Sequence, residues 1–274
     1  MKISEADREL DEILSRGHDE REAVNIKKIF WEDLFNYKGG IDRALHTREM
    51  IVFRDAMRKL ERGLPIQYVT EIAFFYNYRF EVNEAVLIPR PETEELVYKM
   101  LSDRVEGKVL DIGTGSGCIA VTIKCRRPNC DVEAIDVSSR AIEVAKRNAE
   151  KHDATIKFQN LDFLDEKSWF SLERYDVIIS NPPYISRDEI SEMSISTLEH
   201  EPAVALFPED EDVLIFYKKI AAFGKDHILP GGKIYLECNE FNALEVKALF
   251  QENGYEKVEI EQDLQGKNRM IIVG

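Results

Sequence analysis

Four consecutive residues, Asn181, Pro182, Pro183 and Tyr184, combine side chains that could hold a planar NH₂ group. The two prolines fix φ at about −65° and remove two backbone donors. The Asn181 side chain and nearby carbonyl groups therefore present rigid acceptors, and the Tyr184 ring offers a flat face. The tetrapeptide predicts a clamp for an amide or amino nitrogen, although Asn and Pro are also common in ordinary strand-to-loop turns.

Such a clamp suits methyl transfer to nitrogen. The lone pair of a planar amide or amino nitrogen is delocalised into the adjacent π system, which makes it a poor nucleophile. Acceptors on both N–H bonds would orient the nitrogen toward a sulfonium methyl group and stabilise the positive charge that grows on it. No strong general base is needed before the transfer.

A glycine-rich sequence, D-I-G-T-G-S-G, begins at Asp111, where a predicted strand meets a predicted helix. Glycines at such a turn let the backbone and a ligand approach each other closely. Asp136 ends the next predicted strand, where a carboxylate can accept hydrogen bonds from two ribose hydroxyls. The candidate cofactor-binding residues of the turn are Gly113, Thr114, Gly115, Ser116 and Gly117.

The glycine-rich turn alone does not identify the cofactor. Gly115, Gly117 and Ala120 also fit the relaxed G-x-G-x-x-A pattern of a dinucleotide site, so S-adenosylmethionine and NAD both remain possible at this point. The N-P-P-Y sequence after another strand favours methyl transfer over hydride transfer, because hydride transfer has no need of an amide clamp.

Metal chemistry is not expected. The five histidines show no ligand spacing and the four cysteines contain no C-x-x-C pair, so we predict neither a metal site nor a disulfide framework. Arg90 and Glu92 stand beside prolines at the start of a predicted helix. This pair is equally consistent with organising the mouth of a crevice and with bracing the chain.

The residues with candidate chemistry follow strands of a predicted parallel sheet. Apolar β-type runs alternate with helical segments, which is the signature of βαβ units. The last two runs are close enough to form a hairpin, with one strand antiparallel to the rest. Seven strands are predicted, at 109–112, 132–137, 156–158, 176–180, 233–237, 258–260 and 270–273, and a Pro-Gly-Gly turn at 230–232 precedes the fifth.

Upstream of this sheet, apolar residues recur at helical spacing and predict a small N-terminal helical bundle. The aromatic segment at residues 73–82 predicts a two-stranded hairpin with Asn77 in its turn. We therefore expect a helical substrate-recruiting domain at 1–72, a β-hairpin linker at 73–88 and a catalytic domain at 89–274.

Charge and composition narrow the function classes. The chain is 44% apolar with a net charge of −15, and residues 91–274 hold 22 basic and 35 acidic side chains. Because no basic cluster is present, direct DNA binding is not expected. No apolar run is long enough for a membrane span, and the acidic first ten residues do not resemble a signal peptide, so we expect a soluble, cytoplasmic protein. The acidic run at 209–212 is expected to be a solvated loop or the start of a helix.

Three motifs together resemble the release factor glutamine methyltransferases, the HemK/PrmC family. They are I-P-R-P-E-T-E at 88–94, D-I-G-T-G-S-G at 111–117 and N-P-P-Y at 181–184. Shorter matches extend the resemblance over nearly the whole chain, including G-x-P-x-x-Y from Gly63, E-P at Glu201, L-E at Leu236 and D-L-x-G-x-x-R from Asp263.

The resemblance implies a Rossmann-like, class I methyltransferase sheet of seven strands with the last one antiparallel. It also implies S-adenosylmethionine as methyl donor and N5-methylation of the glutamine in the G-G-Q loop of peptide chain release factors. Under this resemblance Gly113–Gly117 match the methionine-side loop and Asp136 the ribose-binding acid. Phe163 matches an aromatic beside the adenine, in place of a more common tryptophan, and Asn181–Tyr184 match the substrate-amide clamp.

Two other functions fit part of this pattern. A nucleic-acid amino-methyltransferase acting on adenine N6 or guanine N2 would also need a clamp for a planar NH₂ group, but the acidic C-terminal part disfavours it. A non-catalytic S-adenosylmethionine-binding protein would have no need of an intact clamp. We expect a monomer whose partner is the release factor.

Overall fold

The computed structural model describes residues 1–104, 106–208 and 212–274. They form two compact units, one of residues 1–72 with 194–200 and the other of residues 73–193 with 201–274. Three residues of the acidic run, 209–211, lie outside the described residues, so the expected loop or helix start is not tested there. Across the described ranges, no helix combines the length and the apolar character that crossing a membrane requires.

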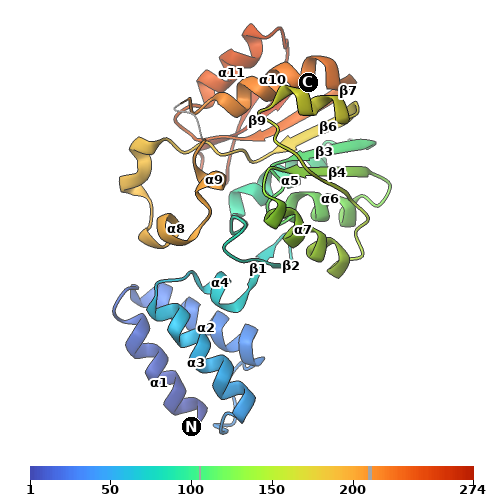
Figure 1. Cartoon of the computed structure of the whole chain (residues 1–274). Coiled ribbons are helices and arrows are strands. Elements are labelled where there is room, and N and C mark those ends of the chain that lie inside the picture. Colours follow the sequence, from blue (N-terminus) through green and yellow to red (C-terminus); the bar gives the residue numbers. More distant parts are fainter. Residues whose placement is uncertain (105, 209–211) are drawn as a thin grey trace. The chain divides into compact units, whose positions relative to one another are not determined.

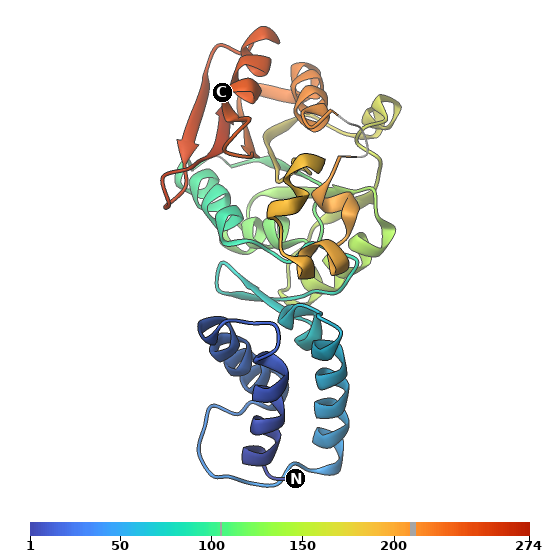
Figure 2. The ribbon, with the colours of Figure 1, turned by 90° about the vertical axis from the view of Figure 1, so that its left-hand side faces the viewer.

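The first unit is helical, as the sequence predicted. Helix α1 packs against both of the next two helices (Figure 2), and Leu10, Phe30 and Phe53 are fully buried. Asp19 caps the second helix by accepting a hydrogen bond from the Glu22 N–H. The helices of this unit are α1 (Ile3–Leu14), α2 (Glu20–Phe35), α3 (Thr47–Glu61), α4 (Ile66–Thr70) and α8 (Ile195–His200).

Helix α8 belongs to this unit although the chain reaches it only after the N-P-P-Y sequence. Within the unit, the Ser196 hydroxyl donates to the Gly63 carbonyl at 3.0 Å, and His200 Nε2 lies 3.1 Å from the Arg62 carbonyl oxygen. The sequence pattern did not indicate this assignment, because it depends on contacts between segments more than 130 residues apart.

The second unit is built on a seven-stranded sheet in the order β5-β4-β3-β6-β7-β9-β8. β9 is antiparallel to both of its neighbours, and the other strand pairs are parallel. The predicted sheet and its antiparallel last strand are therefore confirmed. The strands are β3 (Lys108–Ile112), β4 (Asp131–Asp136), β5 (Lys157–Asn160), β6 (Tyr175–Ser180), β7 (Ile228–Glu237), β8 (Val258–Gln262) and β9 (Asn268–Val273).

Helices cover both faces of this sheet (Figure 1). Successive side chains of a strand point to opposite faces, so Val177 and Ile179 join one core cluster while Ile178 joins the other. The first cluster lies under α5 (Pro91–Ser102) and α6 (Cys118–Arg126), with α7 (Ser139–Lys151) beside α6, and the second lies under α10 (Ile215–His227) and α11 (Ala243–Glu252). The shorter helices of this unit are η1 (Glu166–Ser171), η2 (Arg187–Glu192) and α9 (Ala203–Leu206).

The predicted hairpin is also confirmed, as β1 (Ile72–Phe75) and β2 (Tyr78–Glu81). Its two turn residues, Tyr76 and Asn77, both have positive φ, 52° and 66°. This is the backbone conformation that a tight two-residue hairpin turn requires, and Asn tolerates it better than most residues.

β7 begins earlier than the sequence predicted. The predicted turn at Pro230–Gly232 instead lies within the strand, at an irregularity where the register with β6 shifts. A Cβ on Gly232 would lie 2.8 Å from the Asp176 carbonyl oxygen, so only glycine lets the two strands approach here. The glycines therefore keep the strand paired where the sequence signal favoured a turn.

Candidate active site

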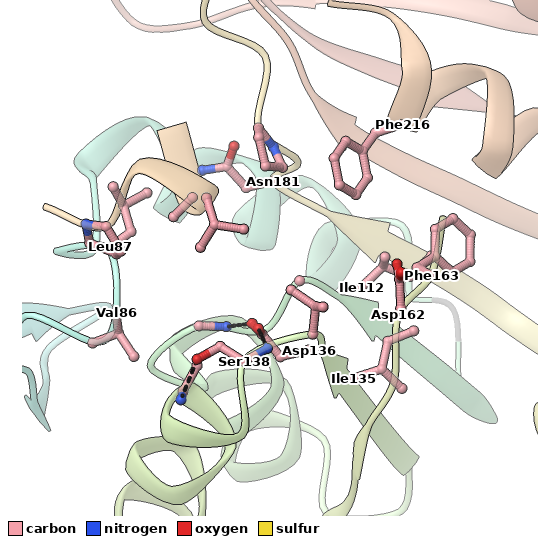
Figure 3. A pocket seen from close by; sticks show the side chains of 18 of the residues that line it. Val86, Leu87, Ile112, Ile135, Asp136, Ser138, Asp162, Phe163, Asn181 and Phe216 are labelled. Atoms are coloured by element: carbon pink, nitrogen blue, oxygen red, sulfur yellow. Dashed lines mark hydrogen bonds between the residues drawn. The ribbon is translucent and has the colours of Figure 1, made fainter. Parts of the chain in front are cut away.

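A pocket opens at the carboxyl ends of β3, β4 and β6 (Figure 3). These strands are neighbours in the sheet, and the Ser180 hydroxyl at the end of β6 donates to the Ile112 carbonyl of β3 at 2.7 Å. Ligands of open α/β sheets bind at this edge of the strands. Of the sequence-predicted site residues, those that line the pocket are Gly113, Gly115, Asp136, Phe163, Asn181 and Pro183.

Five predicted residues do not line the pocket: Thr114, Ser116, Gly117, Pro182 and Tyr184. Two of them support the glycine-rich turn from behind. The Thr114 hydroxyl donates to Asp111 Oδ2 at 2.6 Å, and a Cβ on Gly117 would come within 3.1 Å of the Ala145 Cβ on α7. Gly117 therefore permits close packing of two helices instead of contacting a ligand.

The turn itself leaves an open cradle. Gly113 and Gly115 have positive φ, 74° and 54°, and a Cβ added to either would meet no atom within 4 Å. The backbone N–H groups of Gly113 and Thr114 both donate to the Ile135 carbonyl, at 2.9 and 3.0 Å. The turn is thus held against β4, while the space that side chains would occupy at Gly113 and Gly115 remains open to the pocket.

Asp136 connects the turn to the end of β4. One carboxylate oxygen accepts from the Gly115 N–H at 2.9 Å and the other from the Ser138 N–H at 2.8 Å (Figure 3). Burial raises the pKa of Asp136, and the two backbone donors partly offset this effect. Each oxygen has one further lone pair for a ligand hydroxyl.

Phe163 and Phe216 form part of an apolar wall of the same pocket (Figure 3). Leu161 also lines the pocket. The Phe163 ring packs 5.5 Å from the Trp169 ring, and the Trp169 Nε1 donates to the Phe163 carbonyl at 2.9 Å. Phe163 is 4% exposed, so its position is fixed by packing. A flat apolar wall of this kind fits a planar heterocycle.

The Asn181 side chain reaches the pocket from the end of β6. Its Nδ2 donates to Thr93 Oγ1 on α5 at 3.0 Å, and Thr93 Oγ1 donates to Glu237 Oε2 at 2.6 Å. The Tyr184 hydroxyl donates to the other oxygen of Glu237 at 3.0 Å. Thr93 and Glu237 belong to sequence motifs, but no pattern in the sequence indicated chemistry for them.

Two further walls of the pocket were missed from the sequence, residues 85–87 and 202–207. They are joined by an ion pair in which Arg90 Nη2 donates to Glu201 Oε1 at 2.6 Å, and the Ile88 N–H donates to Glu201 Oε2. The Glu201 side chain is 1% exposed. Arg90 therefore braces the walls of the crevice, and the sequence signals for them were its P-R-P context and the E-P motif at Glu201.

Metal chemistry finds no support among the residues that the structure describes. No group of three or more His, Cys, Asp or Glu side chains there could hold a metal ion. The four cysteines are free. Burial raises the pKa of Cys118 and of Cys238 to about 12 in each case, so both are inert thiols at neutral pH.

The fold and the pocket together define a class I methyltransferase that uses S-adenosylmethionine. A family model described as "Methyltransferase small domain" matches residues 92–223. Among solved structures, a methyltransferase from Pyrococcus furiosus has a TM-score of 0.53 and 21% identity, over 72% of this chain and 89% of that one. This likeness shows the fold alone.

Curated relatives identify the family. A release factor glutamine methyltransferase of Lactococcus lactis is 40% identical over 256 residues, which cover 92% of this chain and 91% of the relative. Another, of Streptococcus pneumoniae, is 38% identical over 282 residues, with coverage of 100% and 98%. The chain belongs to the release factor glutamine methyltransferase family.

Proposed function

We propose that this chain transfers a methyl group from S-adenosylmethionine to the side-chain nitrogen of the glutamine in the G-G-Q motif of peptide chain release factors. The observation that carries the proposal is the position and orientation of Asn181. Its side chain lines the same pocket as the open glycine turn and Asp136, and its NH₂ group is bonded to Thr93. The remaining amide oxygen is an acceptor suited to a substrate NH₂ group.

The residues around the pocket fit the cofactor. Gly113 and Gly115 provide a cradle that a Cβ would fill, Asp136 has acceptor capacity for two ribose hydroxyls, and Phe163 offers a wall for the adenine. S-adenosylmethionine supplies an electrophilic methyl group carried by a sulfonium. Asn181 is proposed to contact both the cofactor and the substrate, because it belongs to the clamp and lines the same pocket as the cradle.

The chain's own contribution is positioning and charge stabilisation. Asn181 Oδ1 accepts one N–H of the substrate amide, and a carbonyl of the Pro182–Pro183 segment accepts the other. Because both prolines lack an N–H, this turn offers acceptors and no competing donor. Positive charge that develops on the nitrogen is stabilised by these fixed acceptors, and the released proton passes to water after transfer.

We propose that the helical unit recruits the protein substrate. Exposed apolar side chains of this unit, Ile41 at 87%, Ile51 at 66% and Val24 at 64%, are available for a protein partner. Removing residues 1–72 would also remove the packing partners of 194–200, so single substitutions test this role more cleanly. Ile51→Ser should raise KM for intact release factor several-fold and leave KM for a short Gly-Gly-Gln peptide unchanged. An equal effect on both substrates would contradict recruitment.

The function is tested by mass spectrometry of a release factor incubated with the protein and S-adenosylmethionine. One added methyl group on the G-G-Q glutamine is expected, and none on a release factor that carries glutamate there. Ribosomal RNA and DNA serve as parallel substrates, since an amino-methyltransferase of nucleic acid is the alternative. Methylated RNA or DNA with unmodified release factor would refute the proposal. We further propose that the protein is cytoplasmic and monomeric. Sedimentation of the purified chain tests its oligomeric state.

A further inference from the structure

The side chains of Asn181, Thr93 and Glu237 form a directed chain of hydrogen bonds that begins at the pocket wall. Glu237 is the last residue of β7 and Thr93 lies in the first turn of α5, and they are 1% and 3% exposed. The Asn181 Nδ2 group donates to Thr93 Oγ1 at 3.0 Å, and the Thr93 hydroxyl donates to Glu237 Oε2 at 2.6 Å. Glu237 lines no part of the pocket, so any effect it has on a ligand there passes through other residues.

The direction of each bond follows from the number of protons available. Burial raises the pKa of Glu237, and the hydrogen bonds from Thr93 and Tyr184, which favour the charged form, oppose this effect. As a carboxylate Glu237 only accepts, and a threonine hydroxyl has a single proton. When Thr93 gives that proton to Glu237, its oxygen can only accept from Asn181. A flipped Asn181 amide would place Oδ1 against the Thr93 oxygen with no proton between them, which leaves buried acceptors unpaired.

The second oxygen of Glu237 keeps the carboxylate in place. The Tyr184 hydroxyl donates to Glu237 Oε1 at 3.0 Å. Burial raises the pKa of Tyr184 well above its usual value, so this phenol keeps its proton and remains a donor. Both oxygens of Glu237 are thus engaged by hydroxyl donors, one from the helix and one from the clamp.

We propose that Glu237 is a positioning residue for methyl transfer, which acts through the Thr93 hydroxyl to fix the Asn181 amide with its oxygen toward the substrate. The inference rests on the proposed function of Asn181 as the substrate-amide clamp. It also assigns the site a means of discrimination. An oxygen held toward the substrate accepts from the NH₂ of glutamine but repels a glutamate carboxylate, whereas an amide free to flip could donate to either substrate.

Glu237→Gln tests this assignment with little change of shape. When the new side chain keeps its oxygen toward the Tyr184 hydroxyl, its NH₂ group faces Thr93. The Thr93 proton is then free to donate to a flipped Asn181. We expect kcat for release factor methylation to fall by roughly 10- to 100-fold, as for loss of one preorganised partner of a developing charge. The Kd for S-adenosylhomocysteine should change much less than kcat, because Glu237 lies outside the pocket and the glycine turn and Asp136 are unaltered.

Thr93 provides a second, independent pair of variants. Thr93→Val keeps the side-chain shape but removes the hydroxyl, so it should lower kcat to a similar extent as Glu237→Gln. Thr93→Ser retains the hydroxyl and should restore most of the wild-type rate. If Ser and Val reduced kcat equally, the hydroxyl would not be the connecting group and the proposal would be overturned.

Glu133→Gln is the matched control. Glu133 is also a buried strand carboxylate, 5% exposed, and it accepts from a tyrosine hydroxyl, that of Tyr175, at 2.8 Å. Its other partners are Gln159 and Lys157, and none of the three lines the pocket, whereas Glu237 is connected through Thr93 to Asn181, which does. A merely structural role for Glu237 predicts similar losses of both stability and kcat in the two Gln variants. Positioning predicts that only Glu237→Gln lowers kcat when the two are compared at temperatures well below their unfolding midpoints.

A double-mutant cycle and a peptide competitor complete the test. Once Asn181 is replaced by Ala, adding Glu237→Gln should cause less than about a threefold further loss of kcat, because the amide that it orients is gone. A Gly-Gly-Glu peptide should inhibit Glu237→Gln more strongly than wild type. Fully multiplicative losses, or unchanged inhibition, would overturn the inference. Failure of wild type to methylate release factor would instead overturn the proposed function, so the two failures are distinguishable.

Discussion

Replacing Asp136 by Asn should weaken cofactor binding while leaving the fold largely unaffected. The two carboxylate oxygens accept the Gly115 and Ser138 N–H groups at 2.9 and 2.8 Å. An Asn side chain has the same shape, but its NH₂ group must face one of these donors, which leaves a backbone N–H unpaired. Its remaining oxygen is also neutral, so any bond to a ribose hydroxyl loses its charge assistance.

The expected loss of binding free energy is about 1–3 kcal/mol, the range for a hydrogen bond to a charged group or an unsatisfied donor, which corresponds to roughly 5- to 150-fold in Kd. Protein stability should change less, because burial raises the pKa of Asp136 and removing the charge relieves that desolvation cost. The two effects on the free protein therefore oppose each other.

Isothermal titration with S-adenosylhomocysteine measures this loss, and thermal unfolding of the free protein measures the change in stability. Asp165→Asn is the control, because Asp165 likewise accepts a backbone N–H, from Lys167, but does not line the pocket. Wild-type affinity of Asp136→Asn, or an equal loss in Asp165→Asn, would refute the assignment of Asp136 as the ribose-binding acid.

Two further predictions concern stability. Burial raises the pKa of Asp111 to about 7, above the usual 3.8, so the folded state binds an extra proton between these values and the free energy of unfolding falls as pH rises from about 4 to 7. Asp111→Asn should remove the pH dependence that Asp111 contributes to the free energy of unfolding, at most about 4 kcal/mol. Urea unfolding of both proteins from pH 4 to 8 measures it. The prediction is refuted if the free energy of unfolding has the same pH dependence in the wild type and the variant. Gly224→Ala in α10 should destabilise by about 1–3 kcal/mol although Ala normally favours a helix, because the new Cβ would lie 2.4 Å from the Tyr255 hydroxyl oxygen. The double variant Gly224→Ala, Tyr255→Phe should recover part of the lost stability, as measured by thermal unfolding. A Gly224→Ala variant more stable than wild type would contradict the predicted clash.

The sheet could be predicted from the sequence because its signal is local. Val177, Ile178 and Ile179 are all apolar since helices cover both faces of the sheet, and that continuous run is visible in the sequence. The start of β7 was predicted incorrectly because Gly231 and Gly232 favour a turn in isolation. Their actual role depends on the close approach of the Asp176 carbonyl, which no local pattern encodes.

The part of the candidate site that could be predicted from the sequence consists of residues at the carboxyl ends of strands. Asp136 is the last residue of β4 and Asn181 directly follows β6, so a parallel sheet brings them to one edge. Thr93 and Glu237 are 144 residues apart and could not be paired from the sequence, since their hydrogen bond depends on how α5 packs on the sheet. The N-P-P-Y pattern predicted a role only for the ring face of Tyr184, and the structure adds a hydrogen bond from its hydroxyl to Glu237.

The chain path bears on how substrate recruitment and chemistry are connected. After the proposed clamp at Asn181–Tyr184 the chain enters the helical unit at Ser194, leaves it at His200, and returns to the second unit at Glu201. The chain is held in place at the residue where it returns, because the Glu201 carboxylate accepts hydrogen bonds from both Arg90 and the Ile88 N–H. The helical unit is therefore joined covalently to the catalytic unit through the hairpin and also through the segment between the amide clamp and a wall of the pocket. If the helical unit binds the protein substrate, as proposed above, its segment 194–200 connects that binding to the site through the chain, because it begins ten residues after Tyr184 and ends immediately before Glu201.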